Sequence, residues 1–105
     1  MFKRKNRFTF SEKLPTNLYS SSSFVLRFSK NDPNFKVAIV ASKKIDKRST
    51  KRNVAKRKFV HALKEIIPTD SNFVLIFYVK KNALTVSSID LRKEIERALR
   101  YADSI

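Results

Sequence analysis

The segment that most constrains the fold is an apolar run with hydrophobic side chains on both faces. Residues 72–80 read NFVLIFYVK, and neither alternate set of side chains is polar. A strand of this kind has to be covered on both sides, so we expect it in the centre of a sheet. It is far shorter than the roughly 20 residues that cross a bilayer as a helix. The segment therefore predicts a small globular protein built around one buried strand.

Two further segments show the alternation of half-buried strands. Residues 36–42 (KVAIVAS) alternate between two faces, and so do residues 24–30 (FVLRFSK). The turn-forming sequence NDPN separates the two segments, so we expect them to pair as a hairpin. The core-facing side chains of the earlier segment are expected to be Phe24, Leu26 and Phe28.

Two segments repeat apolar residues at the spacing of an amphipathic helix. The first runs from about residue 50 to residue 66, with Ser49 as its cap and Pro68 as its stop. The second follows Ser88, which we expect to cap it. The run of four serines before the first strand reads as a loop, as does the segment before Ser88. The predicted buried stripes are Ala55, Phe59, Ala62, Leu63 and Ile66 in the first helix and Leu91, Ile95, Ala98, Leu99 and Ala102 in the second.

The order of these elements is β-β-α-β-α. A chain of 105 residues falls in the size range of one compact domain. None of its Pro- or Ser-rich stretches is long enough to act as a linker between domains. We therefore expect a single domain over residues 1–105.

Positive charge is concentrated at the start of the first predicted helix. Lys and Arg number 24 against nine Asp and Glu, a formal net charge of +15. Nine of the 16 residues from 43 to 58 (KKIDKRSTKRNVAKRK) are basic, and only Asp46 is acidic. A solvated helix face normally mixes both signs in i, i+4 pairs, whereas like charges stack here. We interpret the block as a surface for nucleic-acid phosphates, aided by the helix N-terminus; a plain solvated face is the alternative.

The N-terminus and one face of the sheet offer further candidate contacts. Phe8 and Phe10 lie among lysines and arginines (KRKNRFTF), a mixture suited to stacking on unpaired bases. Packing of both rings in the core is the alternative. The strand face that carries Arg27 and Ser42 is mostly small. It suits either an extended RNA strand or cover by the N-terminal segment.

The chain lacks the residue patterns that a protein-only nuclease needs. It has no cysteine and no glycine, which excludes thiolate sites and Gly-rich phosphate loops. Its acidic residues are scattered, and we read Asp90, Glu94 and Glu96 as ordinary surface charge on the last helix. The single histidine, His61, is expected on the outer flank of its helix as a surface residue. We therefore expect no catalytic residue in this chain.

Two features of the sequence indicate the cellular compartment of the protein. The absence of cysteine fits a reducing cytosol. The basic N-terminus is followed by no apolar segment and does not read as a secretory signal. We therefore expect a protein of the cytoplasm with no membrane partner.

The pattern around the basic block resembles the bacterial ribonuclease P protein family. A strand ends in Ser-Lys-Lys, a short basic loop follows, and Arg-Asn-x-x-Lys-Arg opens an amphipathic helix. The likeness extends over nearly the whole chain, because the aromatic N-terminus, the strands and the closing helix come in the family's order. The motif residues are Ser42, Lys43, Lys44, Arg52, Asn53, Lys56 and Arg57.

The resemblance implies a fold and an activity. The fold is an α/β (α+β) two-layer sandwich with a small mixed sheet, in the order short α-β-β-α-β-α. Its βαβ crossover is left-handed, an exception to the usual rule. The activity is that of a subunit of ribonuclease P, whose RNA removes the 5′ leader of precursor tRNA. The implied partners are ribonuclease P RNA and precursor tRNA, with no obligate protein partner and with Mg²⁺ held by the RNA subunit.

The resemblance also implies which residues bind RNA. Val54 stands where the family usually has a second arginine, so Lys51 or Lys58 would supply that contact. The expected leader contacts are Phe8, Phe10, Arg27 and Ser42. The expected contacts with the RNA subunit are Lys43, Lys44, Lys47, Arg48, Lys51, Arg52, Asn53, Lys56, Arg57 and Lys58.

Three other functions compete with this one. A ribosomal protein would be equally small and basic, but it leaves the spacing of the motif unexplained. A DNA-binding module would need a preceding helix to dock the basic helix, and an obvious dimer surface. A stand-alone nuclease would need clustered carboxylates.

Overall fold

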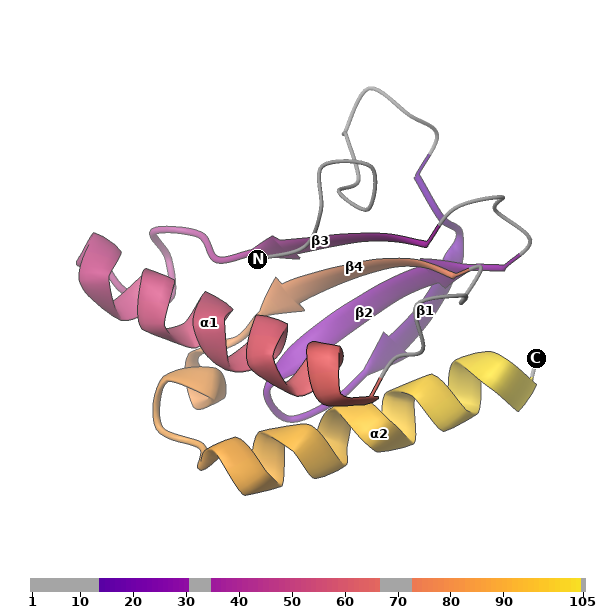
Figure 1. Cartoon of the computed structure of the whole chain (residues 1–105). Coiled ribbons are helices and arrows are strands. Elements are labelled where there is room, and N and C mark those ends of the chain that lie inside the picture. The colour runs from indigo at the N-terminus through magenta and orange to yellow at the C-terminus, as the bar shows by residue number, and fades with distance from the viewer. Residues whose placement is uncertain (1–13, 31–34, 67–72, 105) are drawn as a thin grey trace.

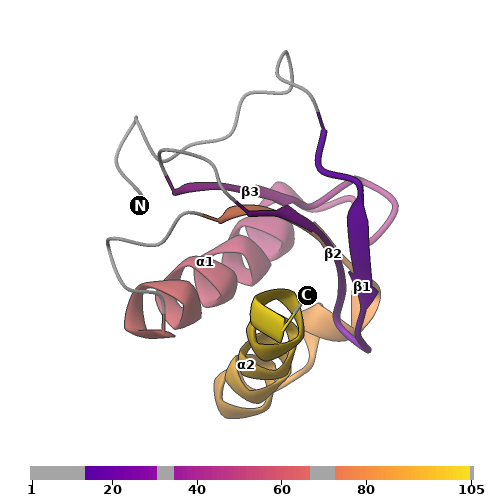
Figure 2. The same cartoon turned by 90° about the vertical axis from the view of Figure 1, so that its right-hand side faces the viewer.

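The protein is a two-layer sandwich of one sheet and two helices. A computed structural model describes residues 14–30, 35–66 and 73–104. Both long helices lie on the same face of the sheet (Figures 1 and 2). The elements in chain order are β1 (Asn17–Ser20), β2 (Phe24–Ser29), β3 (Lys36–Val40), α1 (Ser49–Ile66), β4 (Val74–Val79), the 3-10 helix η2 (Lys81–Leu84) and α2 (Ser88–Ser104).

Strand β4 lies inside the sheet, as its two apolar faces predict. The strand order is β1-β2-β4-β3, with β2 antiparallel and β3 parallel to β4. The predicted hairpin between residues 24–30 and 36–42 is therefore wrong, because β4 separates the two strands. A parallel pair cannot be joined by a tight turn, and α1 supplies the crossover from β3 to β4. The left-handedness of that crossover stays a prediction.

Strand β1 is an element that the sequence did not predict, and it ends at the first of the four serines. It pairs antiparallel with β2, with Asn17 opposite Phe28. The backbone N–H of Ser21 donates to the carbonyl of Phe24 at 2.8 Å and closes the turn between the two strands. β1 is an edge strand with mostly exposed side chains, and Leu18 is 54% exposed. No apolar alternation therefore marks it in the sequence, which predicted no strand here, and the loop prediction for the four serines is wrong only at Ser20.

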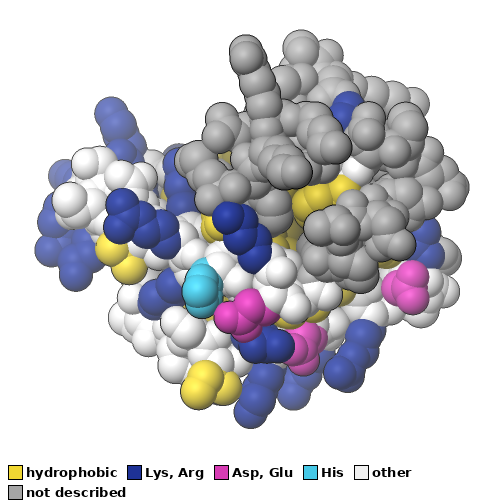
Figure 3. Space-filling model, in the orientation of Figure 1, with side chains coloured by type: hydrophobic (Ala, Val, Ile, Leu, Met, Phe, Trp, Pro, Cys, Tyr) yellow, Lys and Arg dark blue, Asp and Glu magenta, His cyan; other side chains and the backbone are white. Residues whose placement is uncertain are grey.

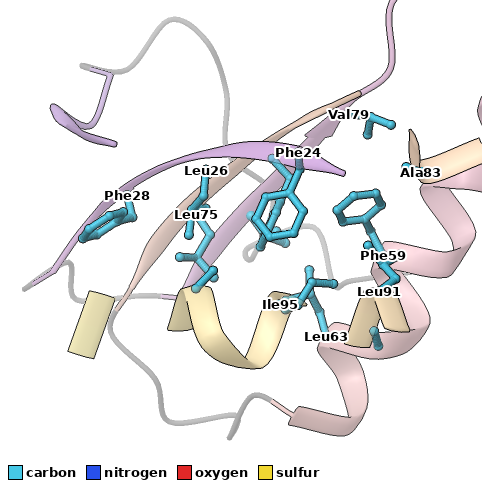
Figure 4. Close-up of a cluster of buried hydrophobic side chains, with 14 of the residues drawn as sticks. Phe24, Leu26, Phe28, Phe59, Leu63, Leu75, Val79, Ala83, Leu91 and Ile95 are labelled. Carbon is cyan, nitrogen blue, oxygen red and sulfur yellow. The ribbon is translucent and has the colours of Figure 1, made fainter. Parts of the chain in front are cut away.

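The core lies between the sheet and the helices and is dominated by aromatic rings (Figure 4). Phe24, Phe59 and Phe77 come from β2, α1 and β4, with ring centroids 5.2–5.7 Å apart. Each is fully buried, which stabilises the fold by roughly 1.5–3 kcal/mol per side chain. The predicted stripes on both helices are confirmed, since Ile66 and Leu99 pack against this core and their other members are buried in it.

The helices begin one residue earlier than the predicted caps imply. The carbonyl of Arg48 accepts from the N–H groups of Lys51 and Arg52, so Arg48 and not Ser49 precedes the first turn of α1. Ser87 caps α2, because its Oγ accepts from the N–H of Asp90 at 3.1 Å. The predicted stop at Pro68 and the short N-terminal helix lie outside the described residues. In the described part of the chain, no helix is long and apolar enough to cross a membrane.

Glu94 holds the turn between β1 and β2 against α2. Its carboxylate accepts from the hydroxyl of Ser21 at 2.5 Å and from the N–H and hydroxyl of Ser23 at 3.0 and 2.7 Å. Asn82 donates to the Ser23 hydroxyl at 2.9 Å, and Ser23 is fully buried. The interpretation of Glu94 as ordinary surface charge is therefore wrong. Buried hydroxyl and amide groups need partners, and this carboxylate supplies them.

We predict that Glu94→Ala lowers the free energy of unfolding by about 1.5–3 kcal/mol. The substitution removes the charged acceptor and leaves the N–H and the hydroxyl of Ser23 without a hydrogen-bond acceptor. Urea denaturation measures this change. Glu96→Ala is the matched control on the same helix, since Glu96 makes an exposed i, i+4 pair with Arg92. It should cost less than about 1 kcal/mol. Equal losses in the two variants would contradict the anchoring role of Glu94.

Candidate RNA-binding site

The Arg-Asn motif lies on one flank of α1. At about 100° per residue, Arg52, Asn53, Lys56 and Arg57 span an arc of about 140°. Lys58 lies on the opposite flank and points toward η2, where its Nζ donates to the carbonyl of Val86 at 3.0 Å. The motif flank therefore faces away from η2 and α2. Asn53 and Arg57 are both exposed on this flank.

The loop before α1 adds lysines to this flank. Ile45 is buried in the core, and its N–H donates to the carbonyl of Ser42 at 3.2 Å to close a turn. This anchor leaves Lys43, Lys44 and Lys47 exposed around it. In Figure 3, Lys and Arg side chains gather on the left, over this loop and the N-terminal half of α1. The loop and the helix together form one cationic surface.

Among the described residues, Arg48 and Asp46 form the one ion pair within this surface. The Arg48 guanidinium donates to both carboxylate oxygens of Asp46, at 3.1 and 3.0 Å. The backbone N–H of Arg48 adds a bond of 2.8 Å. The side-chain bond from Arg48, followed by its backbone bond, lowers the pKa of Asp46 to about 2 and raises the pKa of Arg48. Asp46 thus fixes the entry to α1 and neutralises Arg48 alone.

The other cations of the block have no acidic partner among the described residues. Lys58 is held by the carbonyls of Ala83 and Val86 and is less available to RNA than predicted. Val54 is 49% exposed and so is not part of the buried stripe of α1. Within the described residues, the cations of the block whose side chains make neither an ion pair nor a hydrogen bond are Lys43, Lys44, Lys47, Lys51, Arg52, Lys56 and Arg57.

The predicted leader residues are only partly described. Phe8 and Phe10 lie outside the described residues. Arg27 is half-buried, and its Nη1 donates to the carbonyl of Pro15 at 3.0 Å. Ser42 lies beyond the end of β3 and is exposed. The structure therefore brings Ser42 beside the cationic loop, while Arg27 lies two strands away on β2.

The sheet face opposite the helices is partly buried. Val74 and Ile76 of β4 form a small buried cluster there, with Ala38, Val40 and Tyr78 packed against it. Sequence reasoning missed this cluster, although the two apolar faces of β4 were the signal for it. The exposed part of this face is correspondingly smaller.

His61 is a surface residue, as predicted. Its side chain is 82% exposed, and its Nε2 lies 3.3 Å from Glu65. Glu65 also pairs with Arg92 of α2. Within the described ranges, no three His, Cys, Asp or Glu side chains cluster so that they could hold a metal ion.

The sandwich and its cationic flank define a class: a small α/β protein with a basic surface in which, among the described residues, only Arg48 has an acidic partner, of the kind that binds a phosphate backbone. The family model for ribonuclease P matches residues 2–103. The chain therefore belongs to the ribonuclease P protein family. It is thus a protein subunit of an endoribonuclease that processes the 5′ end of tRNA.

Solved structures of this family share the fold. A ribonuclease P protein of Staphylococcus aureus matches with a TM-score of 0.69 at 18% identity, covering 97% of this chain and 92% of that one. A mutant of the S. aureus protein, described as defective in mRNA degradation, matches with a TM-score of 0.72 at 20% identity, over 83% and 75% of the two chains. The Thermotoga maritima protein matches with a TM-score of 0.69 at 22% identity, covering 81% of this chain and 82% of that one. No curated protein matches by sequence.

The Asp46–Arg48 pair gives a prediction about pH. The Asp46 carboxyl should titrate at pH of about 2, below its ordinary value of 3.8. Because its folded pKa is depressed, the stabilisation is complete above the unfolded pKa and is lost as pH falls through the folded value. NMR titration of the side-chain carboxyl carbons measures the pKa of Asp46. In Arg48→Gln the pKa of Asp46 should rise; an unchanged pKa would show that the pair does not cause the shift.

Proposed function

We propose that the exposed flank of α1 binds the catalytic RNA subunit of ribonuclease P. The observation that carries the proposal is that the cations of this flank lack acidic partners among the described residues, although they crowd one surface. A polyanion relieves their mutual repulsion by releasing counterions as phosphates take their place. Arg52 and Arg57 can also donate paired N–H bonds to phosphate oxygens.

In this proposal the flank positions the RNA and reduces the repulsion between phosphates, while the RNA subunit catalyses the cleavage. Lysines and arginines between two RNA chains screen phosphate repulsion and raise the affinity for substrate. We assign Mg²⁺ to the RNA subunit and give no described protein residue a part in holding it. We also propose that the protein acts in the cytoplasm and that residues 1–105 form one domain. Membership of the family makes a ribosomal role the weaker alternative.

We further propose that the 5′ leader of precursor tRNA contacts Phe8, Phe10, Arg27 and Ser42. Exposed Ser42 lies next to the cationic loop, so a leader strand there would be continuous with the RNA surface of α1. The Arg27 guanidinium has five N–H donors, and one of them donates to the carbonyl of Pro15. Its other N–H groups can donate to a phosphate. Phe8 and Phe10 are assigned from the sequence alone, as rings that stack on unpaired bases.

One reconstitution tests the proposed function as a whole. The purified protein is mixed with a bacterial ribonuclease P RNA and precursor tRNA at low Mg²⁺, where RNA alone cleaves poorly. We expect cleavage at the mature 5′ end only when the protein is present. Tight binding to ribosomal RNA without stimulation of cleavage would overturn the proposal.

We predict that Arg52→Ala with Arg57→Ala weakens binding to the RNA subunit about tenfold or more at physiological salt, because two phosphate contacts are lost. Filter binding or fluorescence anisotropy over a salt series measures it. Lys81→Glu is the control, since Lys81 is exposed on η2 and the change alters net charge equally. If both variants bind alike, net charge and not the α1 flank determines affinity.

Phe8→Ala should lower the affinity of the holoenzyme for precursor tRNA while leaving that for mature tRNA unchanged. Loss of base stacking costs about 1–3 kcal/mol per base. The ratio of the two dissociation constants measures the effect, and Phe2→Ala, at a ring outside the proposed leader set, is the control. Equal weakening for both tRNAs would remove Phe8 from the leader site.

A further inference from the structure

Helix α2 carries a row of basic residues along its solvent side, with acidic residues on both sides of the row, and its sequence is electrically balanced. It carries four basic residues and four acidic ones between Ser88 and Ser104. Two of the acids are engaged within the protein. Glu94 accepts from the serine turn, and Glu96 accepts from Arg92 at 3.2 Å. Arg92 also reaches Glu65 of α1, so this basic residue is engaged too.

Three cations remain on the solvent side of α2. Lys93, Arg97 and Arg100 follow one another at i, i+4 and i+7, within an arc of about 60° on the helix surface. All three are exposed, and none has an ion pair with a described residue. Like charges at this spacing destabilise a helix unless something neutralises them. Lys and Arg side chains are visible over α2 along the lower edge of Figure 3.

An aromatic ring borders this stripe. Tyr101 lies one helical turn after Arg97 and is 43% exposed. Its inner side packs on Tyr19 and Phe28, with ring centroids 5.1 and 6.0 Å away. The ring is therefore held in place while part of it faces solvent. A fixed, half-exposed ring beside arginines suits stacking on an unpaired base.

We propose that Lys93, Arg97, Arg100 and Tyr101 form a second RNA-binding surface, which takes an unpaired segment of the RNA that α1 binds. The inference rests on the proposed function for the identity of that RNA. The motif flank of α1 faces away from α2, so the two surfaces cannot contact the same stretch of backbone. The protein then bridges two segments of one RNA.

The test compares two variants with equal changes in charge, Arg97→Gln with Arg100→Gln and the control Lys81→Glu. Each binds bacterial ribonuclease P RNA over a salt series, and hydroxyl-radical footprinting maps the protected nucleotides. Each lost phosphate contact lowers the slope of log K against log salt by about 0.7–0.9. We expect the α2 variant to lose about 1.5 in slope and one protected segment, and the control to lose neither.

A footprint of the Arg52→Ala, Arg57→Ala variant separates this inference from the proposed function. We expect that variant to lose a different protected segment from the one lost by the α2 variant. An unchanged slope and footprint for the α2 variant, with loss for the α1 variant, would overturn the inference and leave the proposed function standing. Loss for the α2 variant alone would overturn the α1 assignment instead.

Discussion

Strand β4 needs apolar cover on both faces, and this requirement arranges the rest of the molecule. Central placement of β4 gives it β2 on one side and β3 on the other. Because β3 is parallel to β4, the chain between them has to cross the sheet, and α1 is that crossing. The basic loop and the start of α1 therefore follow the end of an edge strand directly. The packing that builds the core thus also presents the cationic surface.

The second constraint is how the acidic residues are used. Glu94 satisfies the buried Ser23, Asp46 fixes the entry to α1, and Glu65 and Glu96 tie Arg92 between the helices. Each of these carboxylates has a partner within the fold. Among the described residues, the cations of the motif flank of α1 and of the outer stripe of α2 have no acidic partner, and this is the basis for proposing that they bind RNA.

The sequence predicts the parts of this structure that depend on local periodicity. The apolar stripes of both helices, the alternation of β2 and the central place of β4 follow from side-chain spacing. Strand pairing depends on contacts distant in sequence, so the NDPN turn wrongly suggested a hairpin. Edge strand β1 buries too little to show a pattern. The role of Glu94 depends on serines more than 70 residues away and is visible only in three dimensions.

The candidate site likewise has features that the sequence predicts and features that only the three-dimensional structure shows. Crowding of like charge between residues 43 and 58 is a property of the sequence and predicts the surface. Which of these cations the protein itself engages is a matter of geometry. Arg48 lies beside Asp46, and Lys58 reaches the carbonyls after η2. Neither contact follows from helical spacing alone.

The central claim is that the motif flank of α1 lies against RNA in the holoenzyme. The chain has no cysteine, so a short photo-crosslinking group can be attached at Asn53→Cys or, as a control directly after η2, at Thr85→Cys. The account predicts crosslinks to the ribonuclease P RNA from position 53 and not from position 85. Crosslinks from position 85 alone, or equal crosslinks from both, would contradict it.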